Sequence, residues 1–204
     1  MIDLRITIWL SIQLFAIMDP LAAIPALLDI VSSLDSREAT RLINKASIAI
    51  FLLLTIFTTI GGYILIAFGI SISSLKIAAG IILMATAIDT LITGHKPERI
   101  RVGEYVIVPI ATPLIVGPGT MTLLITSSRL YGVLSTLMAS YMAFVYTYVV
   151  LRFSRRIARL AGETFIHGLG RFMSIIIASF AVEMFIGGIE EFISTLQVVP
   201  RVYV

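Results

Sequence analysis

The sequence predicts an all-α membrane protein with six transmembrane spans, arranged as two inverted three-helix repeats whose first and fourth spans are broken. Two observations lead to this fold. Of the 204 residues, 58% are hydrophobic, and the mean hydropathy is +1.04, which is more apolar surface than a soluble domain of this size can bury. In addition, a pattern of polar residue, Pro, Leu, any three residues and Pro occurs twice, at 19–25 and at 112–118.

Six apolar stretches are long enough to cross a hydrocarbon core of about 30 Å as helices. They cover approximately 6–34, 46–68, 71–93, 104–129, 131–151 and 171–199. The polar segment 35–38 is expected to be a loop, and Gly69 and Gly132 are expected in tight turns. The basic segment 152–171 has apolar residues at helical spacing, which predicts a surface-lying extension of the fifth helix.

The two halves of the chain follow one plan, so we expect residues 1–94 as a first repeat and 95–204 as a second, together forming one membrane domain. Besides the proline pairs, the segment 85–94 matches 179–188 in its pattern. Each half holds three spans, which is an odd number. The second half therefore enters the membrane from the opposite side, and the repeats are expected to be inverted.

Positive charge is concentrated on one side of this predicted topology. The first, third and fifth loops hold 11 of the 15 Lys and Arg residues. They are Arg37, Arg41, Lys45, Lys96, Arg99, Arg101, Arg152, Arg155, Arg156, Arg159 and Arg171. The positive-inside rule then predicts a multi-pass protein of the cell membrane with both termini outside.

The proline pairs predict where a ligand binds. Proline removes a backbone donor and blocks continuation of a helix, so Pro25 and Pro118 are expected to begin the second fragments of their spans. Free N–H groups at such breaks favour a carboxylate, and free carbonyls favour an ammonium group or a cation, which together suit a small zwitterion. The residues expected to bind substrate are Asp19, Pro20, Ala22, Ala23, Pro25, Thr112, Pro113, Gly117, Pro118, Gly119 and Thr120. The structural alternative is that the prolines only kink the helices.

Carboxylates inside spans are costly and are by default functional. Glu183, near the centre of the sixth span, and Asp89, in the third, are the candidates for a coupling group. The alternatives are that Glu183 is a hydrogen-bonded packing group, that Asp89 reaches the interface, and that Asp19 is a helix N-cap.

Composition also argues against several classes of protein. The absence of Cys excludes disulfides, cysteine-ligated metals and thiol nucleophiles. His95 and His167, the two histidines, are expected in or beside loops, and no Ser-His, paired-Asp or ATP-binding motif occurs. We therefore expect no enzyme activity, no cofactor and no metal. The net charge of +3 belongs to basic loops and does not indicate nucleic-acid binding.

The same residues resemble the MarC family of integral membrane proteins, which includes small neutral amino acid transporters. The segment 113–119 fits the family pattern Pro-Leu-x-x-Gly-Pro-Gly, and 19–25 fits Asp-Pro-x-Gly-Asn-x-Pro in part. Ala22 and Ala23 stand where that pattern has Gly and Asn, so backbone groups must supply contacts that a side-chain amide would make.

The resemblance implies a secondary transporter of small neutral amino acids such as glycine or alanine. The expected coupling ion is the proton, with sodium as the alternative. Two other functions remain open at this point: a channel or transporter for another small solute, and a membrane structural protein that transports nothing.

Overall fold

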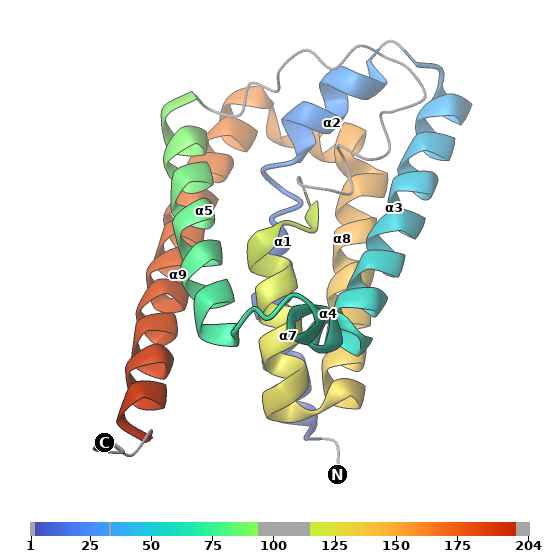
Figure 1. The fold of residues 1–204 in the computed structure, drawn as a ribbon. Helices are drawn as coiled ribbons and strands as arrows, with labels where there is room; N and C mark the ends of the chain where they lie inside the picture. The colour runs from blue at the N-terminus through green and yellow to red at the C-terminus, as the bar shows by residue number, and fades with distance from the viewer. Residues whose placement is uncertain (1–2, 33, 94–114, 199–204) are drawn as a thin grey trace, which may run out of the picture.

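The structure, a computed structural model, describes residues 3–32, 34–93 and 115–198, and helices joined by short turns make up these ranges (Figure 1). In chain order the helices are α1 (Leu4–Met18), α2 (Ile24–Val31), α3 (Ser36–Thr59), α4 (Gly61–Ala67), α5 (Ile72–Thr93), α7 (Pro118–Tyr131), α8 (Val133–Ala161) and α9 (Glu163–Val198).

Four of these helices are long and apolar enough to cross a membrane, namely Ser36–Thr59, Ile72–Ile92, Val133–Ala161 and Thr164–Gln197. The shorter apolar helix Leu4–Met18 accompanies them. The prediction of an all-α, multi-pass membrane protein is thereby supported. The first part of the expected fourth span lies within 94–114, outside the described residues, so the number of six spans and the inverted repeats stay predictions.

The start of α3 corrects the sequence analysis. The segment 35–38 is not a loop, because Ser36 already begins the helix. The cause is a capping box: the Asp35 carboxylate accepts from the backbone N–H of Glu38 at 2.6 Å, and the Glu38 carboxylate accepts from that of Asp35 at 3.4 Å. The helix also ends early, at Thr59, and the last part of the expected second span forms the separate helix α4.

The turns were better predicted than the span limits. Gly69 and Gly132 both adopt positive φ, +65° and +84°, in the connections that follow α4 and α7. The basic segment 152–171 is helical in its first part, where α8 continues to Ala161. Gly162 then turns the chain with a φ of +80°, and α9 begins at once. His167 and Arg171 therefore lie inside α9 rather than in a linker.

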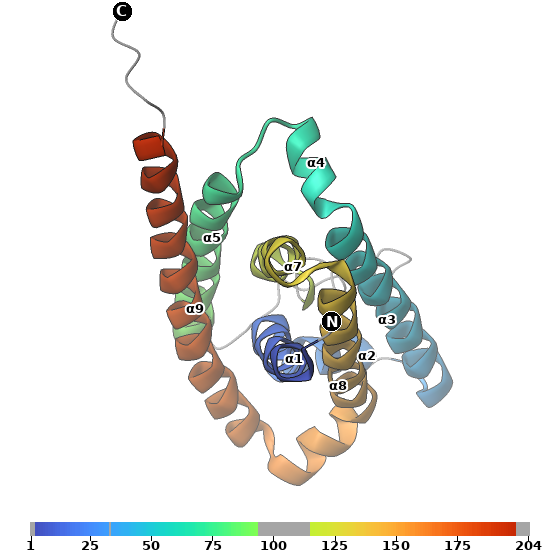
Figure 2. The same ribbon diagram turned by 90° about the horizontal axis from the view of Figure 1, so that it is seen from below.

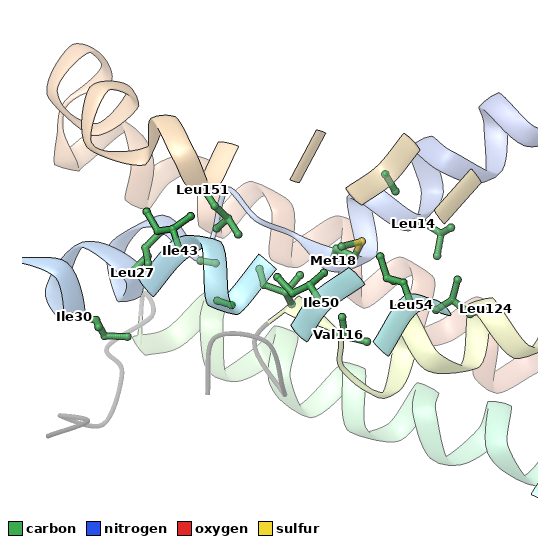
Figure 3. Packing of buried hydrophobic residues seen from close by; sticks show 14 of the residues in the cluster. Leu14, Met18, Leu27, Ile30, Ile43, Ile50, Leu54, Val116, Leu124 and Leu151 are labelled. Atoms are coloured by element: carbon green, nitrogen blue, oxygen red, sulfur yellow. The ribbon is translucent and has the colours of Figure 1, made fainter. Parts of the chain in front are cut away.

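The helices form two groups. Figures 1 and 2 show α5 and α9 side by side along one edge, while α1, α3, α7 and α8 form the remainder of the bundle. Contacts pair Gly80 with Ala181 and Phe185, and Gly188 with Ser73 and Ile77, so α5 and α9 run antiparallel. The main core lies in the other group, where Leu14, Met18, Ile50, Leu54 and Leu124 belong to one buried cluster (Figure 3).

Charge distinguishes the two ends of the bundle. The beginning of α1 and the end of α9 lie at the same end (Figure 1). The described Lys and Arg residues expected inside occur at the other end, at the beginning of α3, the end of α8 and the beginning of α9. One of them has a structural role: Arg155 of α8 donates from Nη2 to the carbonyls of Val31, at 2.6 Å, and Leu34, at 3.3 Å. It thereby satisfies acceptors at the C-terminal end of α2.

Candidate functional site

The first membrane span is broken where the sequence predicts it. α1 ends at Met18, and Asp19 adopts a left-handed conformation with φ 40° and ψ 57° that few residues other than glycine accept. Its backbone N–H bonds to the carbonyl of Phe15 at 3.1 Å, and its buried carboxylate accepts from the N–H of Ala22 at 3.2 Å. Asp19 therefore ends α1 and holds the turn after it. The residue that precedes α2 is Ala23, so Asp19 is not the N-cap of that helix, although its carboxylate accepts from an N–H three residues on, as the side chain of an N-cap does.

The helices that follow the proline pairs begin without help from side chains. α2 starts at Ile24, one residue before Pro25, and α7 starts at Pro118 as expected. The N-cap positions are Ala23 and Gly117, and within the described residues no side chain caps either start. The first N–H groups of each helix point along the axis and carry its positive dipole end. At the start of α2 the Ile24 N–H is bonded to the Leu21 carbonyl at 3.2 Å and Pro25 has no N–H, so the helix dipole is what this start offers to an anionic group.

The first break and the start of α7, where the sequence predicts the second break, border one buried core. Met18 and Ala23 flank the first break, Ile115 and Val116 precede α7, and all four belong to the same cluster (Figure 3). Gly119 and Thr120 are buried in the first turn of α7, where the Thr120 hydroxyl donates to the Ile115 carbonyl at 3.3 Å. Thr112 and Pro113, also expected to bind substrate, lie outside the described residues.

A small cavity lies against the first break. Its volume is about 10 Å³, room for a single water molecule. Ala22 and Pro25 line it on the side of the break. The other lining residues are Thr90 of α5 together with Ile166, His167, Gly170 and Arg171 of α9. A side chain built on Gly170 would come within 3.8 Å of the Ala22 methyl group, which shows how closely α9 approaches the break.

The sequence analysis did not connect Arg171 or Thr90 with this site. Arg171 is counted there as a positive charge of the fifth loop and is not assigned to the binding site. The signal that could have drawn attention to it is a guanidinium a few residues inside a long apolar helix, where a charge needs a polar partner or a route to the interface. The structure supplies the missing information, because it brings the beginning of α9 against the break.

The second break is covered by a side chain of α5. A Cβ atom built on Gly119 would lie 2.5 Å from Cδ1 of Leu83, so Leu83 already fills the space beside the first turn of α7. Glycine at this position permits that contact. One face of α5 thus runs past both breaks, with Leu83 at the start of α7 and Thr90 at the cavity.

The structure does not bring the two coupling candidates to the breaks. Glu183 is exposed on α9, whose residues Ala181 and Phe185 make the contact with α5. Asp89 is exposed on α5, one position before Thr90. Neither residue lines the cavity described above.

Comparisons with known proteins place this sequence in a family. The model of the MarC family, described as integral membrane proteins, matches residues 4–193. This chain belongs to the MarC family. It is 34% identical over 190 residues to a UPF0056 membrane protein of Archaeoglobus fulgidus, covering 87% of this chain and 89% of that protein. It is also 31% identical to a UPF0056 membrane protein of Buchnera aphidicola subsp. Baizongia pistaciae, covering 93% of this chain and 95% of that one.

A third relative, from Pyrococcus horikoshii, is 31% identical over 185 residues and carries the same UPF0056 description. The match covers 87% of this chain and 90% of the relative, so the similarity extends over most of both proteins. No solved structure matches it.

Proposed function

We propose that this MarC family protein is a secondary transporter of small neutral amino acids, with glycine and alanine as its substrates. The observation that carries the proposal is the pair of helix starts that no described side chain caps, at Ala23 and Gly117, which both border one buried core. Interrupted helices at membrane depth are tolerated where they line a cavity, and in transporters they mark the substrate site.

The substrate carboxylate binds at the first break in this proposal. There the start of α2 offers the positive end of the helix dipole. The Ile24 N–H is already bonded to the Leu21 carbonyl at 3.2 Å, and Pro25 has no N–H to donate. Arg171 lines the same cavity and supplies a guanidinium, which pairs with a carboxylate through two parallel hydrogen bonds. The ammonium group is left to acceptors at the ends of the broken helices, such as the carboxylate of Asp19 and free carbonyls.

The small size of the substrate follows from the same cavity. Its volume of about 10 Å³ is too small for an amino acid, so the proposal requires the site to open before substrate binds. Three of the seven lining residues are small or compact, namely Ala22, Pro25 and Gly170. A site that opens between such closely spaced helices suits a side chain of a hydrogen atom or a methyl group better than a larger one.

Energy coupling, orientation and internal symmetry are further parts of the proposal. The coupling ion is a proton, with Glu183 and Asp89 as candidate carboxylates, and sodium is the alternative. The two halves of the chain act as inverted repeats, and the basic end of the bundle faces the cytoplasm. The protein works in the cell membrane without a cofactor and performs no chemistry on its substrate.

Counterflow in proteoliposomes tests the proposal. Vesicles loaded with unlabelled alanine and diluted into labelled glycine should accumulate the label. In a carrier, the exit of alanine drives the entry of labelled glycine by exchange, and no ion gradient is needed. In vesicles that contain no substrate, an imposed pH gradient should then drive uptake of labelled glycine. Arg171→Gln should lower the apparent affinity at least tenfold, whereas Arg156→Gln, a matched change at an exposed arginine of α8, should not.

Other outcomes would assign a different function. Flux that neither saturates nor shows counterflow would identify a channel. Counterflow of another small solute, with no competition by amino acids, would retain the carrier and replace the substrate. If no solute is exchanged and none protects the protein against thermal unfolding, the chain has a structural role and the proposal is wrong.

A further inference from the structure

Two buried hydroxyl groups of α7 have no hydrogen-bond partner in the part of the chain that the structure describes. They belong to Thr122 and Thr126, and neither bonds to any other described residue. Thr122 is 1% exposed. Buried hydroxyls elsewhere in the bundle donate to a carbonyl one turn back in their own helix, as Ser47 does to Ile43 at 2.8 Å and Thr58 to Leu54 at 2.7 Å. A buried polar group that leaves this partner unused calls for an explanation.

Helix geometry shows what faces these hydroxyls. Residues three, four and seven positions apart lie on one face of a helix, so Thr122 and Thr126 share a face with Gly119. That face meets α5, because Leu83 packs directly on Gly119. Ala79, one turn before Leu83 on α5, is 1% exposed. The face of α7 that carries the two hydroxyls thus begins at the break. It continues towards the end of the bundle that holds the beginning of α1 and the end of α9 (Figure 1).

The backbones of α5 and α9 are in close contact. A Cβ atom on Gly80 would lie 2.7 Å from the carbonyl oxygen of Ala181, and one on Gly188 would lie 2.9 Å from that of Ser73. Backbones in such close contact leave little freedom between the two helices.

The joints between this pair and the remaining helices are glycines. Gly69 precedes α5 with a φ of +65°, and Gly162 precedes α9 with a φ of +80°. A side chain built on either would meet no described atom within 4 Å, so the chain is uncrowded at both joints. Both are element-terminal positions of the kind that absorb changes of backbone angle in hinge motion. The segment 94–114 also joins the two groups and lies outside the described residues.

We propose that the face of α7 formed by Gly119, Thr122 and Thr126 is the wall of a solute route, and that Leu83 of α5 is the side chain that closes it. The route takes water and small zwitterions, whose ammonium and carboxylate groups hydrogen-bond to the two hydroxyls. It opens when the α5–α9 pair swings away from α7 about Gly69 and Gly162. The inference rests on the proposed transport function for its solute.

Cysteine accessibility tests the route independently of the substrate, because the chain contains no cysteine of its own. Thr122→Cys in the full-length protein, reconstituted in proteoliposomes, should react slowly with a charged membrane-impermeant thiol reagent. Combining it with Leu83→Ala should raise the rate at least tenfold. Ile82→Ala, the same kind of truncation on the exposed side of α5, should not. Ser140→Cys, fully buried on α8 and hydrogen-bonded to Leu137, should stay unreactive in every background.

A second variant separates a functional hydroxyl from a structural one. Thr122→Val keeps the shape and removes the unpartnered hydroxyl, so it should raise the melting temperature. If Thr122 lines the route, the same variant should lower the rate of counterflow at least tenfold. Thr58→Val, which removes a hydroxyl that is already paired, should change counterflow less than twofold.

The outcomes distinguish this inference from the proposed function. If Leu83→Ala exposes Thr122→Cys but no amino acid is exchanged, the route stands and the substrate is wrong. If amino acids are exchanged while Thr122→Cys stays unreactive in both backgrounds and Thr122→Val keeps full counterflow, the function stands and the route is refuted. If Leu83→Ala fails to fold, Leu83→Val replaces it, and we expect a smaller increase in the rate at which Thr122→Cys reacts with the thiol reagent.

Discussion

The pairs α3–α8 and α5–α9 are both antiparallel and apolar, yet they are held together in different ways. Side chains join α3 to α8. The ring of Tyr141 stacks on Phe51 with centroids 4.8 Å apart, and its hydroxyl lies 3.2 Å from that of Thr55. Glycine joins α5 to α9, because Gly80 and Gly188 let each backbone touch the other. The first pair has long side chains that can readjust, whereas the second has rigid surfaces in direct contact.

In the proposed motion, this difference separates the part of the molecule that stays still from the part that moves. α3 and α8 contact the broken helices through the main buried cluster, so shifting them would disturb the core. α5 and α9 meet the breaks mainly through a few residues, among them Leu83, Thr90 and Gly170. A rigid pair with a sparse contact surface is suited to moving as one body.

The largest effect is expected from crowding the glycine contact. In Gly188→Ala the new methyl group would lie 2.8 Å from Cγ1 of Ile77 and 2.9 Å from the carbonyl oxygen of Ser73, so the helices must separate. We expect a loss of about 1–3 kcal/mol in the free energy of unfolding, measured as a lower melting temperature in detergent. Gly187→Ala is the matched control, since no described atom lies within 4 Å of that position. Equal stability of the two variants would show that α5 and α9 do not need close contact.

The next effect concerns the anchor between α8 and the end of α2. Arg155→Ala removes two charge-assisted hydrogen bonds to the carbonyls of Val31 and Leu34. The expected loss is about 1–2 kcal/mol, because both carbonyls lose a charge-assisted hydrogen bond, and the Val31 carbonyl keeps only its bond from the Leu34 N–H. Arg156→Ala, at an arginine that stacks on Phe153, should cost less than half as much in the same unfolding assay. A larger loss in Arg156→Ala would contradict the assigned role of Arg155.

A smaller effect is expected where side chains join α3 to α8. Tyr141→Phe keeps the ring stacked on Phe51 and removes the hydroxyl next to Thr55. We expect a loss of about 0.5 kcal/mol in stability and no change in counterflow. Tyr141→Ala, which also removes the ring, should cost several times more in the same assay. Equal losses in the two variants would mean that the stacking contributes nothing.

The smallest effect should come from the ion pair between Lys76 and Glu191, which connects α5 and α9 at 2.9 Å. Both side chains are partly exposed, at 22% and 41%, so solvent screens the pair. Lys76→Met should change stability by less than about 1 kcal/mol, and raising the salt concentration should reduce the difference further. A loss comparable to that of Gly188→Ala would assign the cohesion of this pair to charge instead of close packing.

Local features of the sequence predicted local features of the fold. The break at Asp19–Ala23, the start of α7 at Pro118 and the turns at Gly69 and Gly132 all follow from the backbone limits of proline and glycine. The predicted start of α3 was wrong because the charged segment 35–38 was interpreted as a loop, although its Asp and Glu have the spacing of a capping box.

The neighbours of the breaks could not be predicted in this way. In a soluble helix the apolar stripe marks the buried face, but a helix in lipid is apolar on all sides. The contact of Leu83 with Gly119 and the position of Arg171 beside Ala22 depend on how whole helices are turned. A usable signal was present in α8, whose buried face carries small and hydroxyl residues such as Thr136, Ser140 and Ala143.

The length of α9 has a consequence for how the lipid acts on this protein. Its 36 residues extend about 54 Å as a straight helix, while the hydrocarbon core is about 30 Å thick. The 22 residues of α5 extend only about 33 Å. The part of α9 that exceeds the hydrocarbon core includes polar residues such as His167 and Arg171, so the tilt of α9 depends on its apolar length and on the thickness of the bilayer. Because Gly170 and Arg171 lie on α9, we expect a change in this tilt to alter the contact of the helix with the first break.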